Sequence, residues 1–382
     1  MSDNSRESNA TYDFFWLVMY NLKNPMSKRK HECEYCGEPN CDGECLYSSD
    51  SDNSSPNNYK MPKIERSPEV KNLEELIAIS KRDVVYTNIN TAMLHNITPQ
   101  LEELMRLIGM EDLKESIFYQ VLYYLQNMHL VPASGSQNDF THTCLMGGPG
   151  VGKTTVAKII AEMYRRAGIL SGDGIFRIAA RSDLIGGYLG QTAMKTKAVL
   201  ESCIGGVLFI DEVYSLGSGE DRGTDSYSKE CIDTINGFMS EHKHDFCLIV
   251  AGYENEIERC FFSVNAGLSS RFPWRHVLKP YTPAELAEIT MKMIKDVNWK
   301  TDVDPKDLAA VIRNKSNQAV FASEARSVEN WLAKAKLAHS KRVFAMDFGS
   351  KFILSIEDFT AGIALMKKNI KADPGPPPGF YT

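Results

Sequence analysis

The residues best suited to chemistry form a glycine-rich segment, Gly147-Gly-Pro-Gly-Val-Gly-Lys-Thr154, which follows an apolar run and precedes a helical pattern. This is the context and spacing of a phosphate-binding loop. Its glycines allow successive backbone N–H groups to point at phosphate oxygens, and the helix N-terminus adds a favourable dipole. We expect Lys153 to contact the β- and γ-phosphates and Thr154 to coordinate Mg²⁺. The predicted nucleotide-binding residues of this segment are Gly147, Gly148, Pro149, Gly150, Val151, Gly152, Lys153, Thr154 and Thr155.

Two carboxylates, Asp211 and Glu212, end a second apolar run that begins at Gly206. In parallel sheets, ligands bind beyond the carboxyl ends of the strands. We therefore expect Asp211 to hold Mg²⁺ through water and Glu212 to act as the base that orients the attacking water. The alternative is a helix-capping aspartate with a solvated neighbour.

The elements that must position these groups alternate between short apolar runs and helical patterns, which predicts an α/β fold with a parallel sheet flanked by helices. The predicted strands are His142–Met146, Ile175–Ala179, Gly206–Ile210, Phe246–Ala251 and His276–Leu278. After Lys279-Pro280 only helical patterns follow, so we expect an all-helical domain. Its predicted helices are Pro283–Trp299, Pro305–Asn314, Ser323–Arg342 and Ile356–Lys367.

The chain divides into five predicted regions. Residues 1–60 form a small Cys-rich and low-complexity segment, and residues 61–98 a linker with weak helical patterning. At Thr98 a predicted N-cap followed by Pro99 opens the nucleotide-binding domain, 99–278. The helical domain covers 279–367, and a Pro-rich tail covers 368–382.

Composition narrows the classes of function. The 382 residues carry a net charge of -6, so no global charge favours nucleic acid or an anionic membrane. The apolar run from Phe14 to Tyr20 is too short to span a bilayer. Five of the nine cysteines sit singly in apolar contexts, which favours a reducing compartment. We expect a cytoplasmic protein with no membrane association, and a nuclear location stays open.

The other four cysteines, Cys33, Cys36, Cys41 and Cys45, lie close together in the sequence. Four thiolates suffice for a tetrahedral Zn²⁺ site, and His31 could replace one of them. Free surface thiols or a redox role are the alternatives. The basic run Lys28-Arg-Lys30 before this cluster is either a solvated surface or a local nucleic-acid contact or import signal.

Taken together, these motifs give the sequence a resemblance to the AAA+ ATPases, in the branch of stage V sporulation protein K and the red-type Rubisco activase. The likeness covers about residues 99–366. It is carried, besides the phosphate loop, by Leu107-Ile-Gly-Met-Glu-Asp-Leu-Lys114, Asp183-Leu-Ile-Gly-Gly-Tyr-Leu-Gly-Gln-Thr192, Gly205-Gly-Val-Leu-Phe-Ile-Asp-Glu212, Gly267-Leu-Ser-Ser-Arg-Phe272 and Glu324-Ala-Arg326.

The resemblance implies a helical lid and a ring, commonly a hexamer, with ATP at each subunit boundary. It implies that Ile108 and Gly109 flank the adenine. It also implies that Arg271 is an arginine finger reaching the neighbour's γ-phosphate, and that Arg326 is a second sensor coupling the lid to that phosphate. On their own, both arginines could instead be surface ion-pair partners.

Tyr188-Leu189-Gly190 follows the second predicted strand, where ring ATPases that thread polypeptides place an aromatic-hydrophobic-Gly loop facing the central pore. The resemblance thus implies that the Tyr188 ring contacts a polypeptide there. A tyrosine packed on its own domain is the alternative. The first sensor departs from the usual Asn or Thr, and its role stays open between Tyr253 and Asn255. Asn265-Ala-Gly-Leu268 replaces the branch's usual Asn-Pro-Gly-Leu, which loosens a turn without abolishing the chemistry.

The sequence thus predicts a ring-forming ATPase that couples Mg²⁺-ATP hydrolysis to remodelling or partly unfolding a protein partner. One alternative is a nucleic-acid motor or loader on the same core, and another is a regulatory scaffold that binds ATP and hardly hydrolyses it. The identity of the substrate and the ring size do not follow from these motifs.

Overall fold

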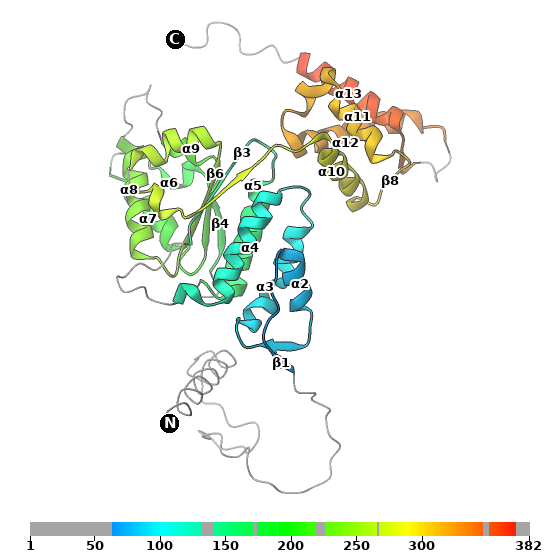
Figure 1. Cartoon of the computed structure of the whole chain (residues 1–382). Coiled ribbons are helices and arrows are strands. Elements are labelled where there is room, and N and C mark those ends of the chain that lie inside the picture. Colours follow the sequence, from blue (N-terminus) through cyan, green and yellow to red (C-terminus); the bar gives the residue numbers. More distant parts are fainter. Residues whose placement is uncertain are drawn as a thin grey trace, which may run out of the picture. The chain divides into compact units, whose positions relative to one another are not determined.

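A five-stranded parallel sheet, in the order β4-β5-β6-β3-β7, forms the centre of the nucleotide-binding region (Figure 1). The computed structural model describes residues 63–130, 141–170, 174–188, 190–217, 226–265, 267–346 and 351–371. The strands are β3 (Thr143–Gly147), β4 (Phe176–Ala179), β5 (Val207–Ile210), β6 (Cys247–Gly252) and β7 (Trp274–Leu278). All five predicted strands are confirmed to within two residues at either end, and so is the α/β fold.

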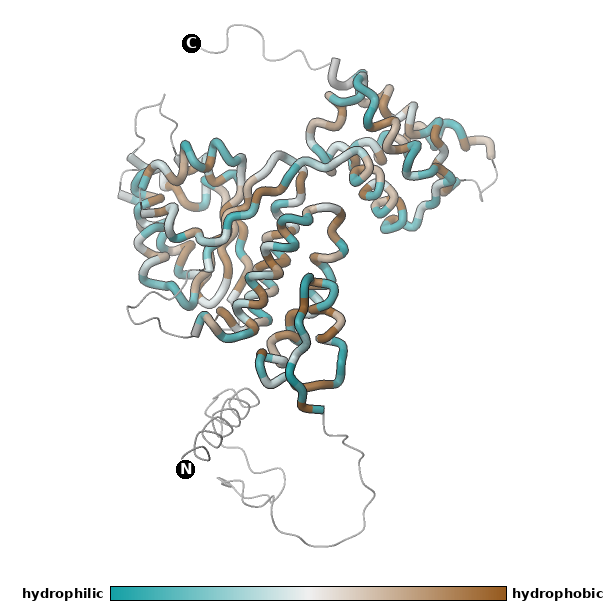
Figure 2. The backbone as a smooth tube through the Cα atoms, viewed as in Figure 1, coloured by the Kyte–Doolittle hydropathy of each residue, from teal (hydrophilic) through white to brown (hydrophobic). Residues whose placement is uncertain are grey.

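Both faces of this sheet are covered, which explains why its three central strands, β5, β6 and β3, are buried and largely apolar. Successive side chains of a strand point to opposite faces. Accordingly Phe209 of β5 packs in one core, and Leu208 and Ile210 pack in the other. The central strands are among the most hydrophobic parts of the chain trace in Figure 2.

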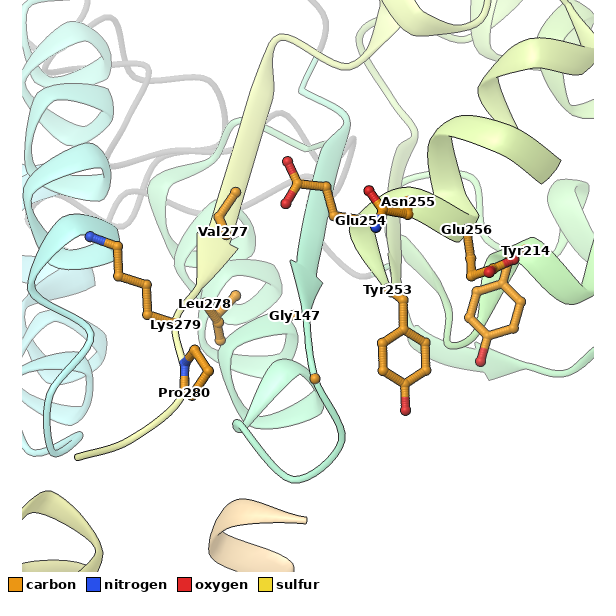
Figure 3. Close-up of a pocket in the computed structure, with 11 residues that line it drawn as sticks. Gly147, Tyr214, Tyr253, Glu254, Asn255, Glu256, Val277, Leu278, Lys279 and Pro280 are labelled. Carbon is orange, nitrogen blue, oxygen red and sulfur yellow. The ribbon is translucent and has the colours of Figure 1, made fainter. Parts of the chain in front are cut away.

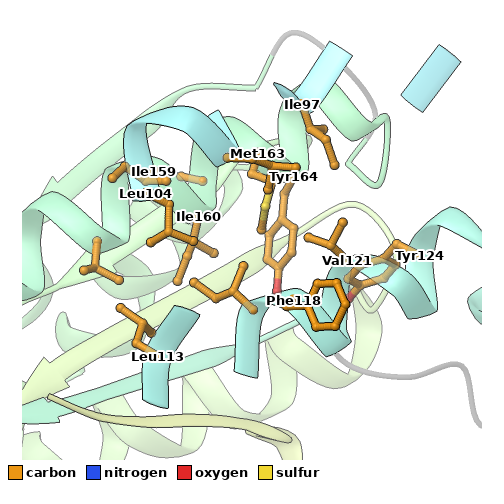
Figure 4. Packing of buried hydrophobic residues seen from close by; sticks show 14 of the residues in the cluster. Ile97, Leu104, Leu113, Phe118, Val121, Tyr124, Ile159, Ile160, Met163 and Tyr164 are labelled. Atoms are coloured by element: carbon orange, nitrogen blue, oxygen red, sulfur yellow. The ribbon is translucent and has the colours of Figure 1, made fainter. Parts of the chain in front are cut away.

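The first core joins the sheet to α3 (Thr91–Met105), α4 (Glu111–Leu125) and α5 (Lys153–Ala167). Figure 4 shows side chains of this core from all three helices, among them Leu104 of α3, Val121 of α4 and Ile160 of α5. The second core lies under α6 (Arg181–Leu184), α7 (Thr192–Glu201), α8 (Ser226–Glu241) and α9 (Glu254–Cys260). Because α5 begins at Lys153, this packing fixes the phosphate loop against the sheet.

The start of α3 corrects one prediction. The helix begins at Thr91, where the side chain of Asn90 accepts a hydrogen bond from Met93 N at 2.9 Å, so the predicted N-cap at Thr98 is wrong. Pro99 lies inside the helix, and Thr98 Oγ1 donates to Leu94 O at 2.7 Å. The helix continues through Pro99 because an apolar face packs against the rest of the first core. That face contains Leu94, Ile97, Leu101 and Leu104.

Before α3 lies a small unit made of β1 (Lys63–Glu65), α2 (Leu73–Ser80) and β2 (Val84–Tyr86). β1 and β2 pair in parallel, with Ile64 opposite Val85. These strands have three residues each, too few to give a periodic signal in the sequence.

The C-terminal region, called the lid below, contains α10 (Pro283–Asp296), α11 (Pro305–Arg313), α12 (Glu324–Arg342) and α13 (Ile356–Lys371). The four predicted helices are confirmed, and they pack around Trp331, whose indole N–H donates to Phe359 O at 2.9 Å. The lid is helical as predicted, and it also has a parallel pair of two-residue strands that the sequence did not predict, β8 (Lys300–Thr301) and β9 (Ile353–Leu354).

The predicted zinc ligands Cys33, Cys36, Cys41 and Cys45 lie outside the described residues. The five remaining cysteines are buried and unpaired, as their apolar contexts predict. Within the described ranges no helix combines the length and the apolar character needed to cross a membrane, and no three His, Cys, Asp or Glu side chains gather as metal ligands would.

Candidate nucleotide-binding site

The phosphate loop connects β3 to α5 and contains two glycines with left-handed backbones. Gly150 has φ +76° and Gly152 has φ +94°, a region that side chains disfavour. A Cβ on Gly150 would collide with the carbonyl oxygen of Ser323 and lie 3.2 Å from Arg326 N. Glycine is therefore required at position 150 for two reasons. The backbone there is left-handed, and the start of α12 packs too closely against it to leave room for a side chain.

Lys153 lies at the first turn of α5, with its ammonium folded over the loop. Its Nζ donates to Gly147 O at 3.0 Å and to Gly148 O at 2.7 Å. Burial lowers the pKa of Lys153, and the carboxylates of Asp211 and Glu212 oppose this effect. Neutral carbonyls are weaker acceptors for an ammonium than phosphate oxygens are. The side chain is thus placed to exchange these carbonyls for a phosphate.

The predicted carboxylates follow β5 at the same end of the sheet. Asp211 Oδ1 accepts a hydrogen bond from Glu212 N at 2.9 Å. Glu212 has φ +49°, an unfavourable conformation for a residue with a side chain. Such strain persists only where the surrounding structure imposes it, and it is concentrated at functional sites. Both side chains are exposed toward the cavity described next.

A cavity of about 420 Å³, a size typical of small-molecule sites, lies between the phosphate loop and the lid. It brings together residues that are far apart in the sequence. Those predicted for the site are Ile108, Pro149, Gly150, Gly152, Lys153, Thr154, Thr155, Asp211, Glu212 and Arg326. Ile108 supplies apolar surface to the cavity, and Lys153 and Arg326 supply positive charge. This combination suits a ligand with a base and phosphates.

Four of the predicted nucleotide-binding residues do not line this cavity. Gly147 and Gly148 line a neighbouring cavity of about 600 Å³ (Figure 3). Val151 is buried in the first core. Gly109 has φ +66° and packs against the side chain of Glu285, so it shapes the turn between α3 and α4.

The sequence does not predict several residues of the cavity, and Tyr281 is one that connects different parts of the site. Its hydroxyl donates to Val151 O at 3.2 Å, and its backbone N–H donates to the Glu324 carboxylate at 3.1 Å. Burial, and then the charges of Glu285 and Glu324, raise the pKa of Tyr281 to about 12. Its only sequence signal is its place just after Lys279-Pro280. The other missed residues are Leu107, Met110, Ile289, Lys292, Met293, Asp296, Ala325 and Glu329.

The two predicted arginines lie in different places. Arg326, in the first turn of α12, lines the cavity. Arg271 does not line it and lies in the 3-10 helix η5 (Ser269–Arg271). Its Nε and Nη2 donate to Ser240 Oγ at 3.0 and 2.8 Å, and its Nη1 donates to Gly267 O. Arg271 is therefore held away from the cavity of its own chain.

Both candidates for the first sensor line the neighbouring cavity, and Tyr253 also contacts the start of α5. Lys153 Nζ lies 5.6 Å from the centroid of the Tyr253 ring. Figure 3 shows the rings of Tyr253 and Tyr214 pointing the same way, toward the end of the sheet where the loop after Gly147 turns. Asn255 lies further along, in α9.

The predicted pore loop lies between α6 and α7. Tyr188 is 74% exposed and Gly190 has φ +81°, while Leu189 lies outside the described residues. The large exposure excludes a tyrosine packed on its own domain. Met194 in α7 is similarly exposed, at 76%.

The fold and the cavity define a nucleoside-triphosphate-binding α/β protein with a helical lid. Residues 143–273 match the family described as "ATPase family associated with various cellular activities (AAA)". The chain is 35% identical over 306 residues to a putative cfxQ-like protein of Acanthamoeba polyphaga mimivirus, covering 78% of this chain and 73% of that protein.

Two further relatives fit the predicted branch. Stage V sporulation protein K of Bacillus subtilis is 34% identical over 265 residues, covering 66% of this chain and 79% of that protein. A chloroplastic ribulose bisphosphate carboxylase/oxygenase activase of Cyanidioschyzon merolae is 36% identical over 249 residues, covering 64% of this chain and 83% of that protein. The chain belongs to the AAA ATPase family, in the predicted branch, and is an ATPase.

Proposed function

We propose that this chain forms a ring, with a hexamer as the expected size, that couples Mg²⁺-ATP hydrolysis to remodelling or partly unfolding a protein partner. The observation that carries the proposal is the cavity between the nucleotide-binding region and the lid. Lys153, the carboxylates after β5 and Arg326 of the lid all line this cavity. A ligand that fills this cavity contacts the core and the lid at once. Hydrolysis of that ligand therefore changes the forces between core and lid.

Each residue has a role that follows from its place. Lys153 and the loop N–H groups bind the β- and γ-phosphates, and Glu212 orients the attacking water. Ile108 and the apolar lid residues enclose the base. The hydroxyl of Thr154 and the carboxylate of Asp211 are hard oxygen ligands that fit Mg²⁺. When bound, Mg²⁺ neutralises charge on the phosphates.

The position of Arg271 supports a site shared between subunits. Phosphoryl transfer gains several orders of magnitude from an arginine at the γ-phosphate. Because Arg271 lies outside its own cavity, it can serve this purpose only in the cavity of a neighbouring copy. A head-to-tail contact of this kind repeats from subunit to subunit and closes a ring when its rotation allows.

Two observations support a protein as the partner. Tyr188 offers an exposed aromatic ring next to glycines, a surface that can hold polypeptides by apolar contact without regard to sequence. One relative is named as the activase of an enzyme, that is, of a protein. The net charge of -6 gives no corresponding support to a nucleic-acid partner.

Affinity capture tests this proposal. The Glu212→Gln variant should bind ATP, hydrolyse it slowly and retain its protein partner, whereas Lys153→Ala should retain none because it does not bind ATP. If both variants capture the same protein equally well, binding of the partner does not depend on the nucleotide, which contradicts the proposal. ATP-dependent capture of nucleic acid in place of protein contradicts the assigned partner class.

A further inference from the structure

Arg275 lies four residues after the proposed finger, outside the sequence stretches that carry the resemblance. It is the second residue of β7, and its guanidinium contacts the turn that contains Arg271. Nη2 of Arg275 donates to Ser269 O at 3.0 Å and also to Ser269 Oγ, and Nε donates to Phe272 O at 3.3 Å. One side chain therefore binds the backbone on both sides of Arg271.

The same guanidinium is anchored to α9 and to a buried aromatic ring. Nη1 of Arg275 donates to the Glu258 carboxylate of α9 at 3.0 Å. Its Cζ lies 4.4 Å from the centroid of the Phe262 ring, which belongs to the second core. A planar guanidinium that meets a carboxylate and an aromatic face is restricted in position. Through Arg275 the backbone at Ser269 and Phe272 is thus connected to α9 and the core.

The side chain of Arg271 is held by different groups, Ser240 Oγ and Gly267 O. Both are neutral acceptors, which are weaker partners for a guanidinium than phosphate oxygens are. The side chain can therefore exchange them for a phosphate while the backbone around it stays in place. Arg275 is less suited to that exchange, because the Glu258 carboxylate already compensates its charge.

We propose that Arg275 is a positioning residue, which fixes the turn 269–272 so that Arg271 is presented to the ATP of a neighbouring copy. The inference rests on the proposed role of Arg271 as the arginine finger. A misplacement of about 1 Å in a reacting geometry can cost on the order of 100-fold in rate. Holding the backbone of the turn in advance also removes conformational entropy from the reaction barrier.

The variant Arg275→Lys keeps the positive charge and replaces the planar fork with a single nitrogen, which cannot maintain all these contacts at once. We expect kcat for ATP hydrolysis to fall about tenfold, a part of the 10³–10⁵-fold that an arginine finger supplies. KM and the Kd of a fluorescent ATP analogue should stay within about twofold, because no residue of the nucleotide cavity changes. Wild-type kcat, or a loss confined to KM, overturns the inference.

The matched control is Arg259→Lys. Arg259 also pairs with a glutamate of α9, since its Nη2 lies 2.8 Å from Glu256 Oε2, and this substitution should leave hydrolysis unchanged. A further variant, Glu258→Ala, removes the anchor on α9 from a side chain that is 49% exposed and leaves Arg275 in place. Its kcat should fall about threefold, less than for Arg275→Lys, because the contacts with the turn remain. If Arg275→Lys does not fold, wild-type kcat in Glu258→Ala overturns the inference.

A mixing experiment shows which cavity is affected. In rings mixed one to one with Glu212→Gln subunits, about half of the Arg275→Lys cavities should meet an intact finger, because each contact is head-to-tail. Hydrolysis per Arg275→Lys subunit should then rise about fivefold, from about a tenth to about half of the wild-type rate. A neighbour cannot repair a defect in the variant's own cavity or fold. Mixing without any such rise therefore overturns the inference.

A double variant separates this inference from the role of Arg271. In the Arg271→Ala background, single-turnover hydrolysis should not fall further when Arg275→Lys is added, because Arg275 acts through Arg271. A further tenfold fall there means that Arg275 acts on ATP or on the fold by itself, which overturns the inference. Full activity of Arg271→Ala alone contradicts the finger itself, and is a different result.

Discussion

The hydroxyl of Tyr281 donates a hydrogen bond to the carbonyl oxygen of Val151, 3.2 Å away, and so connects the segment leading into the lid to the phosphate loop. The backbone N–H of the same tyrosine reaches the Glu324 carboxylate at the start of α12. Tyr281 is thus the residue at which loop, connecting segment and lid meet. Nucleotide binding and lid position should depend on it.

The variant Tyr281→Phe tests this connection. It keeps the ring in the cavity wall and removes one hydrogen bond, worth about 1 kcal/mol net. We expect the Kd for ATP, measured by calorimetry, to rise about fivefold while the thermal unfolding temperature hardly changes. An unchanged Kd would show that the loop and the connecting segment are independent.

Two variants separate ATP binding from ATP hydrolysis, namely Glu212→Gln and Lys153→Ala. The first keeps the shape of the side chain and removes its basicity, so ATP should bind normally and hydrolysis should slow at least tenfold. The second removes the ammonium that faces the phosphates, so binding itself should be lost. Equilibrium binding and steady-state hydrolysis on both variants measure this. Retained affinity in Lys153→Ala would place the nucleotide elsewhere.

Gly150→Ala should abolish ATP binding, because the added Cβ meets the backbone at Ser323 and Arg326, where the lid packs on the loop. Gly168→Ala is the matched control. Gly168, at the end of α5, has φ +69°, close to the +76° of Gly150, but a Cβ there meets nothing within 4 Å. Both variants should lose about 1 kcal/mol of stability from backbone strain. Only Gly150→Ala should lose its affinity for ATP, measured by calorimetry. Equal ATP affinities of the two variants would contradict the packing argument.

A buried ionic group in the lid gives a prediction for pH. Asp358 accepts hydrogen bonds from Arg342 Nε at 2.8 Å, from Ser355 N at 2.9 Å and from His339 Nδ1, also at 2.9 Å. Burial opposes ionisation of Asp358, but the hydrogen bonds from Arg342, Ser355 and His339 outweigh it and hold its pKa well below the ordinary value.

A lowered pKa in the folded state stabilises the protein above the unfolded pKa of about 4, and this contribution is lost as the pH falls below that value. Asp358→Asn should therefore cost about 3 kcal/mol at neutral pH. In urea unfolding, its difference from the wild type should shrink below about pH 4. The exposed Asp83→Asn should change little at any pH. A difference for Asp358→Asn that does not depend on pH would contradict the ionic contribution.

The parts of the site that the sequence predicts are those that local chain geometry determines. Lys153 follows its glycines directly, and Asp211 reaches the same place because parallel strands end at one edge of the sheet. Tyr281 and Met293 could not be predicted, since they reach the cavity only through the packing of the lid. The same limit explains the error at Thr98, where a plausible cap signal was overridden by the tertiary contacts of α3.

The hydrogen bonds that hold Arg271 within its own chain give a prediction for the rate of ATP hydrolysis. Its three hydrogen-bonding nitrogens contact Ser240 Oγ and Gly267 O, so reaching another subunit requires exchanging these partners. Ser240→Ala removes one anchor and should leave the fold intact, with hydrolysis changed less than threefold, since it removes about 0.5–1.5 kcal/mol of hydrogen bonding. A loss as large as that of Arg271→Ala would indicate that Arg271 acts on the fold and not on ATP.

The most direct test of the shared site is a mixing experiment. Glu212→Gln subunits lack the base and Arg271→Ala subunits lack the finger, so each preparation alone should hydrolyse ATP at less than about a tenth of the wild-type rate. In rings mixed one to one, about a quarter of the boundaries should pair an intact cavity with an intact arginine, because each contact is head-to-tail. The account predicts that hydrolysis recovers toward that level on mixing. Recovery that never exceeds the average of the two separate preparations, or full activity of Arg271→Ala alone, would contradict it.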